Sequence, residues 1–524
     1  MTEHPQPRQS EEFLVRSRNA RSRTNWRRCW WLFFCILPLV AGGGGWAAFV
    51  ISAKYRAIYV KYVWVQMLPD EPALRGGRLA RAIVTEGDHC PYILEDGYAM
   101  DMVRRPSPLQ SAFPILICEA KLKGASDAWI GPRHLPGRPD NPQDIVVIGD
   151  TGCRMVYWET QSCLSSDEWP FAAVAARAAS RIEADGHKSV VIHVGDYHYR
   201  ENPCADQNRK CGGSPYGDNW ETWEEEFFKP ASPLLLVAPW VIMRGNHEDC
   251  ARAGAGWIFF FALPGSSSDD ACEHELDSYT LAFGQAGPRR RVLTVFDTAN
   301  ARSPHKIEER CKTYQDWIKS IDDRASIVWL ALHQPLLSRS PDGSRRATAP
   351  QDDSCKPGDD AVKVIRASLL TAPPRRAVRL VLSGDTHVFQ YFQPADHERP
   401  IQIIAGMGGT ELDKLKLLPK DENAEPEDTK SDRARDENVT SYGVVGGALT
   451  IRKHGFVTMQ SDGQTWTVAM LDVTGQTLAT CRFSEMPDSD RHSSALPDCD
   501  DDKDLTAVPP SGDTRGATNL PTGK

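Results

Sequence analysis

The sequence predicts an α/β fold in which two mixed β-sheets pack face to face and helices flank them on the outside. Five short apolar runs end abruptly in a polar turn, as buried strands of such sheets do. A segment between the first two runs has helical apolar spacing, and the stretch 444–483 alternates short apolar runs with turns, which is typical of an antiparallel meander. The five runs are IVVIGD (145–150), VVIHVGD (190–196), WVIMRGNHE (240–248), IVWLALH (327–333) and VRLVLSGDTH (378–387).

The helical segment follows the first run, and we expect it to begin near Asp167 and to end at Gly186. Phe171, Val174 and Ile182 share one face of this helix, which therefore covers a sheet. A strand, a helix and a second strand in this order predict two parallel strands joined by a right-handed crossover. Because ligands collect at the carboxyl ends of parallel strands, the polar residues that end these runs should meet there.

Residues 29–53 contain no charged side chain over 25 positions of the 524-residue chain, which is long enough for a transmembrane anchor. The arm at 1–28 is rich in arginine, so the N-terminus should be cytoplasmic and the rest exported. The apolar helix could continue to Leu68. A signal peptide cleaved near Ala53, which would give a secreted protein, is the alternative.

Twelve cysteines lie outside the apolar segment, and none forms a CxxC pair. An even number of cysteines fits an exported, disulfide-bonded protein, although buried free thiols are an alternative. Pairing between sequence neighbours would close loops beside the strand ends, for example Cys153 with Cys163, Cys204 with Cys211, Cys250 with Cys272 and Cys90 with Cys118. The net charge of -9 gives no reason to expect a nucleic-acid partner.

The pattern of turns and charges divides the exported part into three regions. Residues 76–142 hold short strands between turn-rich segments, which predicts a small β-rich unit. The main domain should span 144–483, and the tail at 486–524, rich in Asp, Ser, Pro and Thr, should be disordered.

Carboxylates, an amide, a phenol and imidazoles gather at or just after the strand ends. Together they form a mixed oxygen and nitrogen ligand set, which suits iron, manganese or zinc. Close carboxylates repel one another, and two cations that share one of them relieve this repulsion, so the set predicts a two-metal hydrolase. The candidate ligands are Asp150, Asp196, Tyr199, Asn246, His333, Asp385 and His387.

The ordered motifs GDTG, GDYHY, GNHE, LALH and GDTH resemble those of the calcineurin-like metallophosphoesterases, and within them the purple acid phosphatase branch, over about residues 144–475. The resemblance implies a four-layer sandwich and a dinuclear centre of iron with manganese, zinc or a second iron. It implies that the first metal is held by Asp150, Tyr199 and His387, that Asp196 bridges both, and that Asn246 and His333 hold the second. Gly152 stands where the wider superfamily has a histidine, and Tyr199 would replace that ligand.

Asp385 departs from this pattern, because the family has a histidine there on the second metal. An aspartate could still be a ligand, with a preference shifted from zinc toward manganese, iron or magnesium. Alternatively Asp385 points away, and the second position is weak or empty.

The resemblance implies hydrolysis of phosphate esters of small molecules, with a hydroxide that bridges the metals as the nucleophile. The N-terminal apolar segment and its arginine-rich arm put this activity on the exported side of a membrane. Asp196 and His247 would be catalytic, and His247 would protonate the leaving oxygen or bind phosphate. The sequence does not choose between monoesters and diesters. The alternative is a non-hydrolytic scaffold that keeps the metal-binding fold. Further candidates for substrate contact are His198, Arg200, Arg244 and Arg252.

Overall fold

The computed structural model describes residues 59–501 with internal gaps, of which the larger are 70–76, 266–271, 284–289, 340–354, 371–376, 418–426 and 486–497. The basic arm expected at 1–28 and the anchor expected at 29–53 lie outside the described residues. Within the described ranges, no helix has the length and apolar character needed to cross a bilayer.

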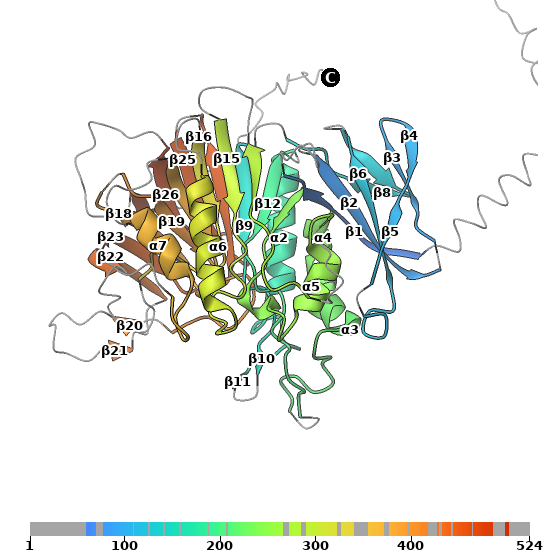
Figure 1. The fold of residues 1–524 in the computed structure, drawn as a ribbon, viewed down its shortest axis with the longest axis horizontal. Helices are drawn as coiled ribbons and strands as arrows, with labels where there is room; N and C mark the ends of the chain where they lie inside the picture. Colours follow the sequence, from blue (N-terminus) through green and yellow to red (C-terminus); the bar gives the residue numbers. More distant parts are fainter. Residues whose placement is uncertain are drawn as a thin grey trace, which may run out of the picture. The chain divides into compact units, whose positions relative to one another are not determined.

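Two large sheets form the centre of the molecule (Figure 1). The first has eleven strands in the order β27-β26-β25-β24-β9-β12-β13-β1-β2-β6-β5, and the second has eight in the order β14-β15-β16-β17-β19-β18-β23-β22. The strands of the first are β1 (Tyr59–Met67), β2 (Arg78–Glu86), β5 (Val103–Arg105), β6 (Leu116–Leu122), β9 (Asp144–Ile148), β12 (Ser189–His193), β13 (Trp240–Ile242), β24 (Gly455–Ser461), β25 (Thr465–Asp472), β26 (Thr477–Ser484) and β27 (Cys499–Asp501). Those of the second are β14 (Tyr279–Phe283), β15 (Arg290–Val295), β16 (Ser326–Ala331), β17 (Val378–Ser383), β18 (Phe389–Pro394), β19 (Ile401–Ala405), β22 (Arg433–Ser441) and β23 (Val444–Ile451).

The two sheets pack against each other through alternate side chains. Ile145 and Val147 of β9 share a buried apolar cluster with Leu380 of β17 and Ile403 of β19. The intervening side chains, Val146 and Ile148, point to the other face of the first sheet, where helices cover them. The prediction of two packed mixed sheets is therefore confirmed.

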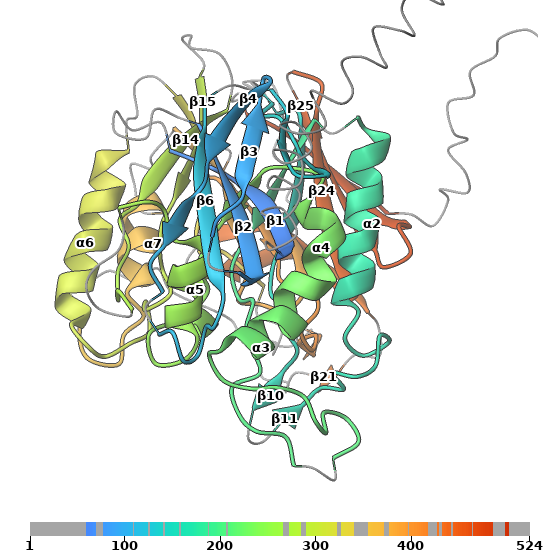
Figure 2. The ribbon, with the colours of Figure 1, turned by 90° about the vertical axis from the view of Figure 1, so that its right-hand side faces the viewer.

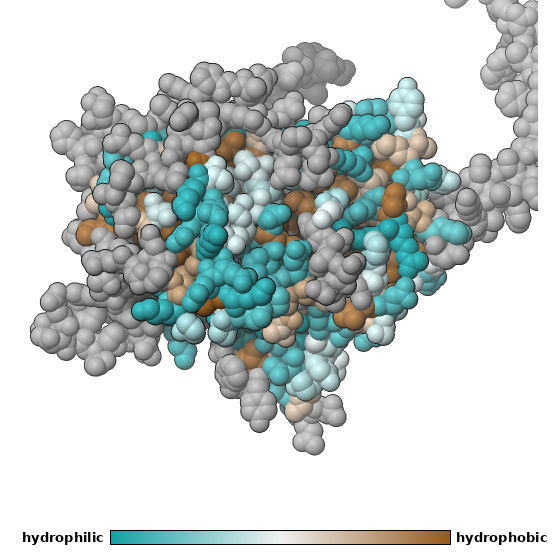
Figure 3. Space-filling view, in the orientation of Figure 1, coloured by the Kyte–Doolittle hydropathy of each residue, from teal (hydrophilic) through white to brown (hydrophobic). Residues whose placement is uncertain are grey.

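Helices cover both outer faces, which makes four layers. Figure 2 shows α2 and α4 on one side of the molecule and α6 and α7 on the opposite side. In Figure 3 hydrophilic side chains dominate the outward face over α6, as expected for an amphipathic helix. The helices are α2 (Phe171–Ala184), α3 (Trp220–Trp223), the π-helical turn Glu224–Phe228, α4 (Lys229–Leu235), the 3-10 turn Asn246–Glu248, α5 (Gly254–Phe261), α6 (Ile307–Ser320) and α7 (Val362–Leu370).

The strands β9, β12 and β13 are parallel neighbours, as the crossover pattern predicts. In the second sheet, β16, β17 and β19 are likewise parallel. The loops that leave the carboxyl ends of these strands therefore emerge at one edge of each sheet. Small pairs of strands lie outside the sheets: β10 (Met155–Val156) with β11 (Glu159–Thr160), and β20 (Lys416–Leu417) with β21 (Glu427–Asp428).

The region expected as a small β-rich unit at 76–142 is divided between two sheets. Its strands β2, β6 and β5 extend the eleven-stranded sheet, to which β1 joins them by pairing with β13. The expected extension of the apolar helix to Leu68 is wrong, because residues 59–67 form β1, whose valines and aromatic side chains suit a strand. The remaining strands form a separate sheet: β3 (Tyr92–Glu95), β4 (Tyr98–Asp101), β7 (Ala128–Ile130) and β8 (Arg133–Leu135).

Six disulfides join the twelve cysteines outside the apolar segment, each to its neighbour in the sequence. All four pairs expected from the sequence are present. The last disulfide, Cys481–Cys499, fastens β27 to β26. The prediction of disorder for 486–524 is therefore wrong at 498–501, because strand pairing and a disulfide hold this short stretch to the sheet.

Candidate metal centre

The candidate ligands follow the carboxyl ends of strands in both sheets. Asp150 comes two residues after β9, Asp196 three after β12, and Asn246 four after β13. His333 and Asp385 each come two residues after β16 and β17. All but the partly exposed Asn246 and Asp385 are buried. The structure thus brings together residues that are up to 237 positions apart in the chain, from Asp150 to His387.

Three of these aspartates adopt left-handed backbone conformations, with φ of 52° at Asp150, 60° at Asp196 and 64° at Asp385. Aspartate tolerates this region better than most residues, but the conformation still carries strain. It turns the chain sharply as each strand ends. Each turn directs a carboxylate across the sheet edge instead of continuing the strand.

Three other candidate ligands converge on the phenol of Tyr199. Its oxygen lies 2.8 Å from Asp196 Oδ2, 3.2 Å from Asp150 Oδ1 and 3.0 Å from His387 Nε2. Gly152 makes room for this ring, because a Cβ there would lie 2.8 Å from Tyr199 Cδ2 and 2.7 Å from Glu226 Oε1. Any side chain at position 152 would therefore clash with the ring of Tyr199 in its present position.

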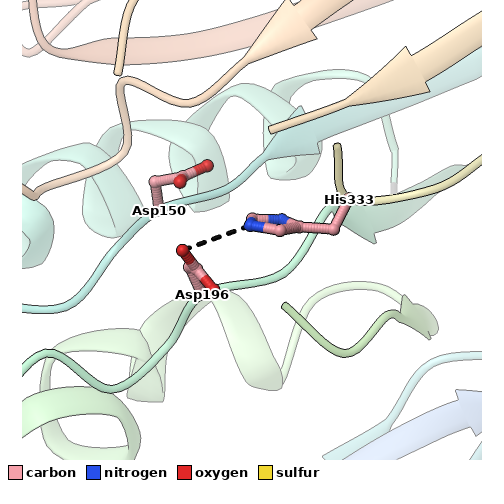
Figure 4. A group of neighbouring side chains, drawn as sticks. All are labelled: Asp150, Asp196 and His333. Carbon is pink, nitrogen blue, oxygen red and sulfur yellow. Dashed lines mark ion pairs between the residues drawn. The ribbon is translucent and has the colours of Figure 1, made fainter. Parts of the chain in front are cut away.

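The ring of His333 points toward the carboxylate of Asp196 (Figure 4). Its Nε2 is 3.2 Å from Asp196 Oδ2 and 3.1 Å from Asn246 Oδ1. Asp150, Asp196 and His333 each offer a ligand atom within 4.8 Å of the others. Oδ2 of Asp196 therefore contacts members of two groups of donors, one made of Asp150, Tyr199 and His387 and the other of Asn246 and His333.

Backbone carbonyls fix the orientation of both imidazoles. Nδ1 of His387 lies 2.9 Å from the carbonyl of Glu411, and Nδ1 of His333 lies 2.7 Å from the carbonyl of Val194. Since a carbonyl only accepts, each Nδ1 carries the proton and donates it. Each Nε2 therefore faces the carboxylates and would offer its lone pair to a bound ion, which is the usual arrangement of histidine ligands of metals.

The buried carboxylates of this cluster would be stabilised by a nearby positive charge. Burial raises the pKa of Asp150 well above its ordinary value, and its Oδ2 is buried without a hydrogen-bond partner among the described residues. Burial alone would lower the pKa of His333, but Asp196 and the other carboxylates raise it to about 10. Burial, followed by the charges of Asp196 and Asp150, raises the pKa of Tyr199. An unpartnered carboxylate oxygen beside a phenol and two oriented imidazoles fits a bound metal ion.

Asp385 differs from the other candidates, because both its oxygens bind a guanidinium. Arg302 Nη1 donates to Oδ1 at 2.9 Å and Nη2 donates to Oδ2 at 2.7 Å. Sequence reasoning missed Arg302, which lies in a loop 83 residues away and belongs to no strand-end run.

His247 lies at the open side of the cluster. Its ring packs on Tyr199 with centroids 3.9 Å apart, and its Nε2 is 3.9 Å from Asp196 Oδ2. Its Nδ1 is 2.6 Å from Oε1 of Glu201, a residue that sequence reasoning also missed. His247 is 14% exposed, so a substrate can reach this imidazole.

The other residues expected to contact substrate are placed less favourably. Arg244 is fully buried and binds Asp297 and two backbone carbonyls, so it stabilises the fold and does not form a phosphate clamp. The His198 ring contacts the carbonyl of Gly217, and the buried Arg200 lies over the ring of Trp169. Arg252 alone lies beside the cluster, paired with Glu201 and Asp249.

Two buried glutamates hold the loops that carry the ligands. Glu248, the last residue of GNHE, accepts hydrogen bonds from the backbone N–H groups of Asp196, Tyr197, His198 and Gly245. Glu226 accepts from Cys153 and Tyr199. Glu248 could have been found from its place in the motif, whereas nothing in the sequence near Glu226 points to this role.

A family model for calcineurin-like phosphoesterases matches residues 144–389, a range that includes all seven candidate ligands. Residues 144–389 are a calcineurin-like phosphoesterase domain. Domains of this family support the assignment of a phosphoric ester hydrolase. A comparison with curated proteins found no match.

The solved structures that resemble this chain share little sequence identity with it. The purple acid phosphatase PPD1 from yellow lupin (Lupinus luteus) seeds is 13% identical, with 82% of this chain and 74% of that chain covered and a TM-score of 0.48. PhoD is 12% identical over 81% of this chain and 90% of its own, with a TM-score of 0.46. GAP50, the anchor in the inner membrane complex of Plasmodium, is 12% identical, with 65% of this chain and 88% of that chain covered and a TM-score of 0.38.

Proposed function

We propose that this chain hydrolyses phosphate esters at a dinuclear metal centre built from the seven candidate residues. Asp150, Tyr199 and His387 would hold the first ion, Asp196 would bridge, and Asn246 and His333 would hold the second. The observation that carries the proposal is the convergence of Asp150, Asp196 and His387 on the phenol oxygen of Tyr199, at distances of 2.8 to 3.2 Å.

When bound, the ions would supply a nucleophile from water and neutralise charge on the phosphoryl oxygens. The protein's own contribution is to orient the ligands and to handle the proton of the leaving group. Glu201 accepts the Nδ1 proton of His247, which leaves Nε2 on the side of Asp196. From there His247 would donate a proton to the leaving oxygen or bind a phosphoryl oxygen.

The ligand types favour particular metals at each position. A phenolate ligand favours trivalent iron at the first position, because a hard, highly charged ion lowers the pKa of the phenol most strongly. The second position, with an amide oxygen and an imidazole, suits manganese, zinc or iron. We further propose that the domain works in an exported, oxidising compartment, and the six disulfides support this location.

The test uses the full chain, purified in detergent and loaded with iron and manganese. We expect hydrolysis of p-nitrophenyl phosphate or its bis ester, and the faster of the two would identify a phosphatase or a diesterase. Asp196→Asn should remove nearly all of this activity, because Asp196 faces both groups of donors. The absence of turnover on both esters in a protein with bound metal would contradict the proposal.

A non-hydrolytic scaffold is the second candidate, and the engagement of Asp385 by Arg302 favours it. Such a protein would bind metal ions without turnover. The same assay separates the two functions, because metal content and hydrolysis are measured on one sample.

A further inference from the structure

The salt bridge between Arg302 and Asp385 lies at the second group of donors. Arg302 belongs to the loop between β15 and α6, and its guanidinium binds both oxygens of Asp385 end-on, at 2.9 and 2.7 Å. The Asp385 side chain is 12% exposed, whereas that of Arg302 is 52% exposed. A bidentate pair of this kind is among the stronger polar contacts in proteins.

Asp385 is close enough to take part in metal binding if it were free. Its Oδ1 lies 4.0 Å from His333 Nε2, and its backbone N–H donates to Asp150 Oδ1 at 3.2 Å. The amide of Asn246, when turned over, would donate to the same Oδ1 at 3.0 Å and accept from Arg252. Hydrogen bonds to both oxygens reduce the electron density that Asp385 can offer to a cation, and a turned amide would offer nitrogen in place of oxygen.

The charges of the cluster point the same way. Three carboxylates face the cluster, those of Asp150, Asp196 and Asp385. The guanidinium together with one divalent ion balances them, so a second ion gains less from this site than it would without Arg302.

We propose that Arg302 makes the metal centre asymmetric. The first position binds an ion tightly, whereas the second binds its ion weakly and exchangeably, because Arg302 holds Asp385 and supplies a fixed positive charge beside it. Arg302 is a positioning residue that acts through Asp385. This inference rests on the proposed metal centre, although it does not require turnover.

The test is equilibrium binding of Mn²⁺ to the full chain after chelation and dialysis, followed by calorimetry and by elemental analysis. We expect the wild type to bind one ion tightly and a second ion more weakly. Arg302→Met should tighten the second ion by about 10-fold or more, because it removes a unit positive charge beside that ion, and should leave the first almost unchanged. Arg482→Met is the matched control, since Arg482 is also about half exposed (44%) and pairs with an aspartate, Asp500, at 2.7 Å.

A double variant, Arg302→Met with Asp385→His, restores the family's histidine without the guanidinium and should bind two ions tightly. Thermal unfolding checks that each variant is folded. Two equally tight ions in the wild type, or a second ion unaffected by Arg302→Met and by the double variant, would overturn the proposal. A chain that binds ions unequally but hydrolyses neither ester would support this inference while it contradicts the proposed function. A wild type that binds no Mn²⁺ would overturn both.

Discussion

Tyr199 joins the two aspartates and the histidine of the proposed first position through a single oxygen atom. The phenol donates a hydrogen bond to Asp196. Burial beside two carboxylates raises the pKa of the phenol when no metal ion is bound. A trivalent ion is what would allow the phenolate to form at neutral pH. The colour of an iron–phenolate bond is therefore a direct test of this residue.

Tyr199→Phe should abolish any visible absorption band of the iron-loaded protein, because it removes the phenolate and leaves the other ligands in place. The measurement is an absorption spectrum at fixed iron content. Tyr197→Phe is the control, since this buried ring stacks on His193, away from the convergence point. A band that survives in Tyr199→Phe would exclude the assignment of Tyr199.

Glu201 is a second residue whose role can be isolated. Burial raises its pKa, but its hydrogen bond to His247 and the charges of His247 and Arg252 together lower the pKa below its usual value, so Glu201 remains ionised. We expect Glu201→Gln to lower kcat about tenfold with little change in KM, because general-acid catalysis contributes roughly 100-fold or more and the glutamine keeps an acceptor without the charge. Steady-state kinetics measure this split. Glu225→Gln, which removes only an exposed pair with Lys229, should leave kcat unchanged.

At the scale of elements, sequence patterns gave strand ends more reliably than helix starts. The helix expected from Asp167 begins at Phe171, because Ser165 to Trp169 form turns and Pro170 precedes the first helical residue. β1 has tyrosines that also fit helical spacing, and only its pairing with β2 and β13 decides the matter. A short segment can fit the apolar spacing of a helix and that of a strand, so its tertiary contacts determine which of the two forms.

The disulfide Cys153–Cys163 closes the loop next to Gly152, and its removal tests how far this element holds the centre together. Replacing both cysteines by serine should lower the free energy of unfolding by about 3 kcal/mol, from the entropy of a short closed loop. We also expect faster loss of metal to a chelator, because Glu226 binds the N–H groups of both Cys153 and Tyr199.

The matched variant removes Cys90–Cys118, which lies in the region at 76–142. It should cost a similar amount of stability without faster loss of metal. Denaturant unfolding and metal release measure the two effects separately. Equal rates of metal release in both variants would show that the first disulfide has no special role at the centre.

At the scale of the whole molecule, the strands before the phosphoesterase domain complete its main sheet. Trp64 of β1 is buried against Phe228 and Phe261, which belong to the helical layer. Arg81 of β2 is also buried and donates to the carbonyls of Phe260 and Ala262 at the end of α5. The domain at 144–389 therefore depends on residues outside its family match.

A fragment that starts at Asp144 should be insoluble or bind hydrophobic dyes, because it exposes the edge of β13 and the apolar partners of β1. A fragment that starts at Tyr59 keeps all eleven strands of the first sheet and should be soluble and monodisperse. Soluble yield and size-exclusion chromatography measure the difference. A folded, active fragment from Asp144 would contradict this dependence.

The sequence alone predicted the two-sheet architecture and the strand ends that carry the candidate ligands. It also named four disulfides between neighbouring cysteines as candidates, and the structure contains all four. These features are local or periodic, since a strand end, a motif and a short loop are each written within a few residues. Only the tertiary structure decided that β1, β2, β5 and β6 extend the central sheet. Only the tertiary structure showed that Arg244 forms an ion pair with Asp297, 53 residues away, and that Arg302 forms one with Asp385. Such pairs join side chains from separate loops, and no local pattern records which charges the fold will bring together.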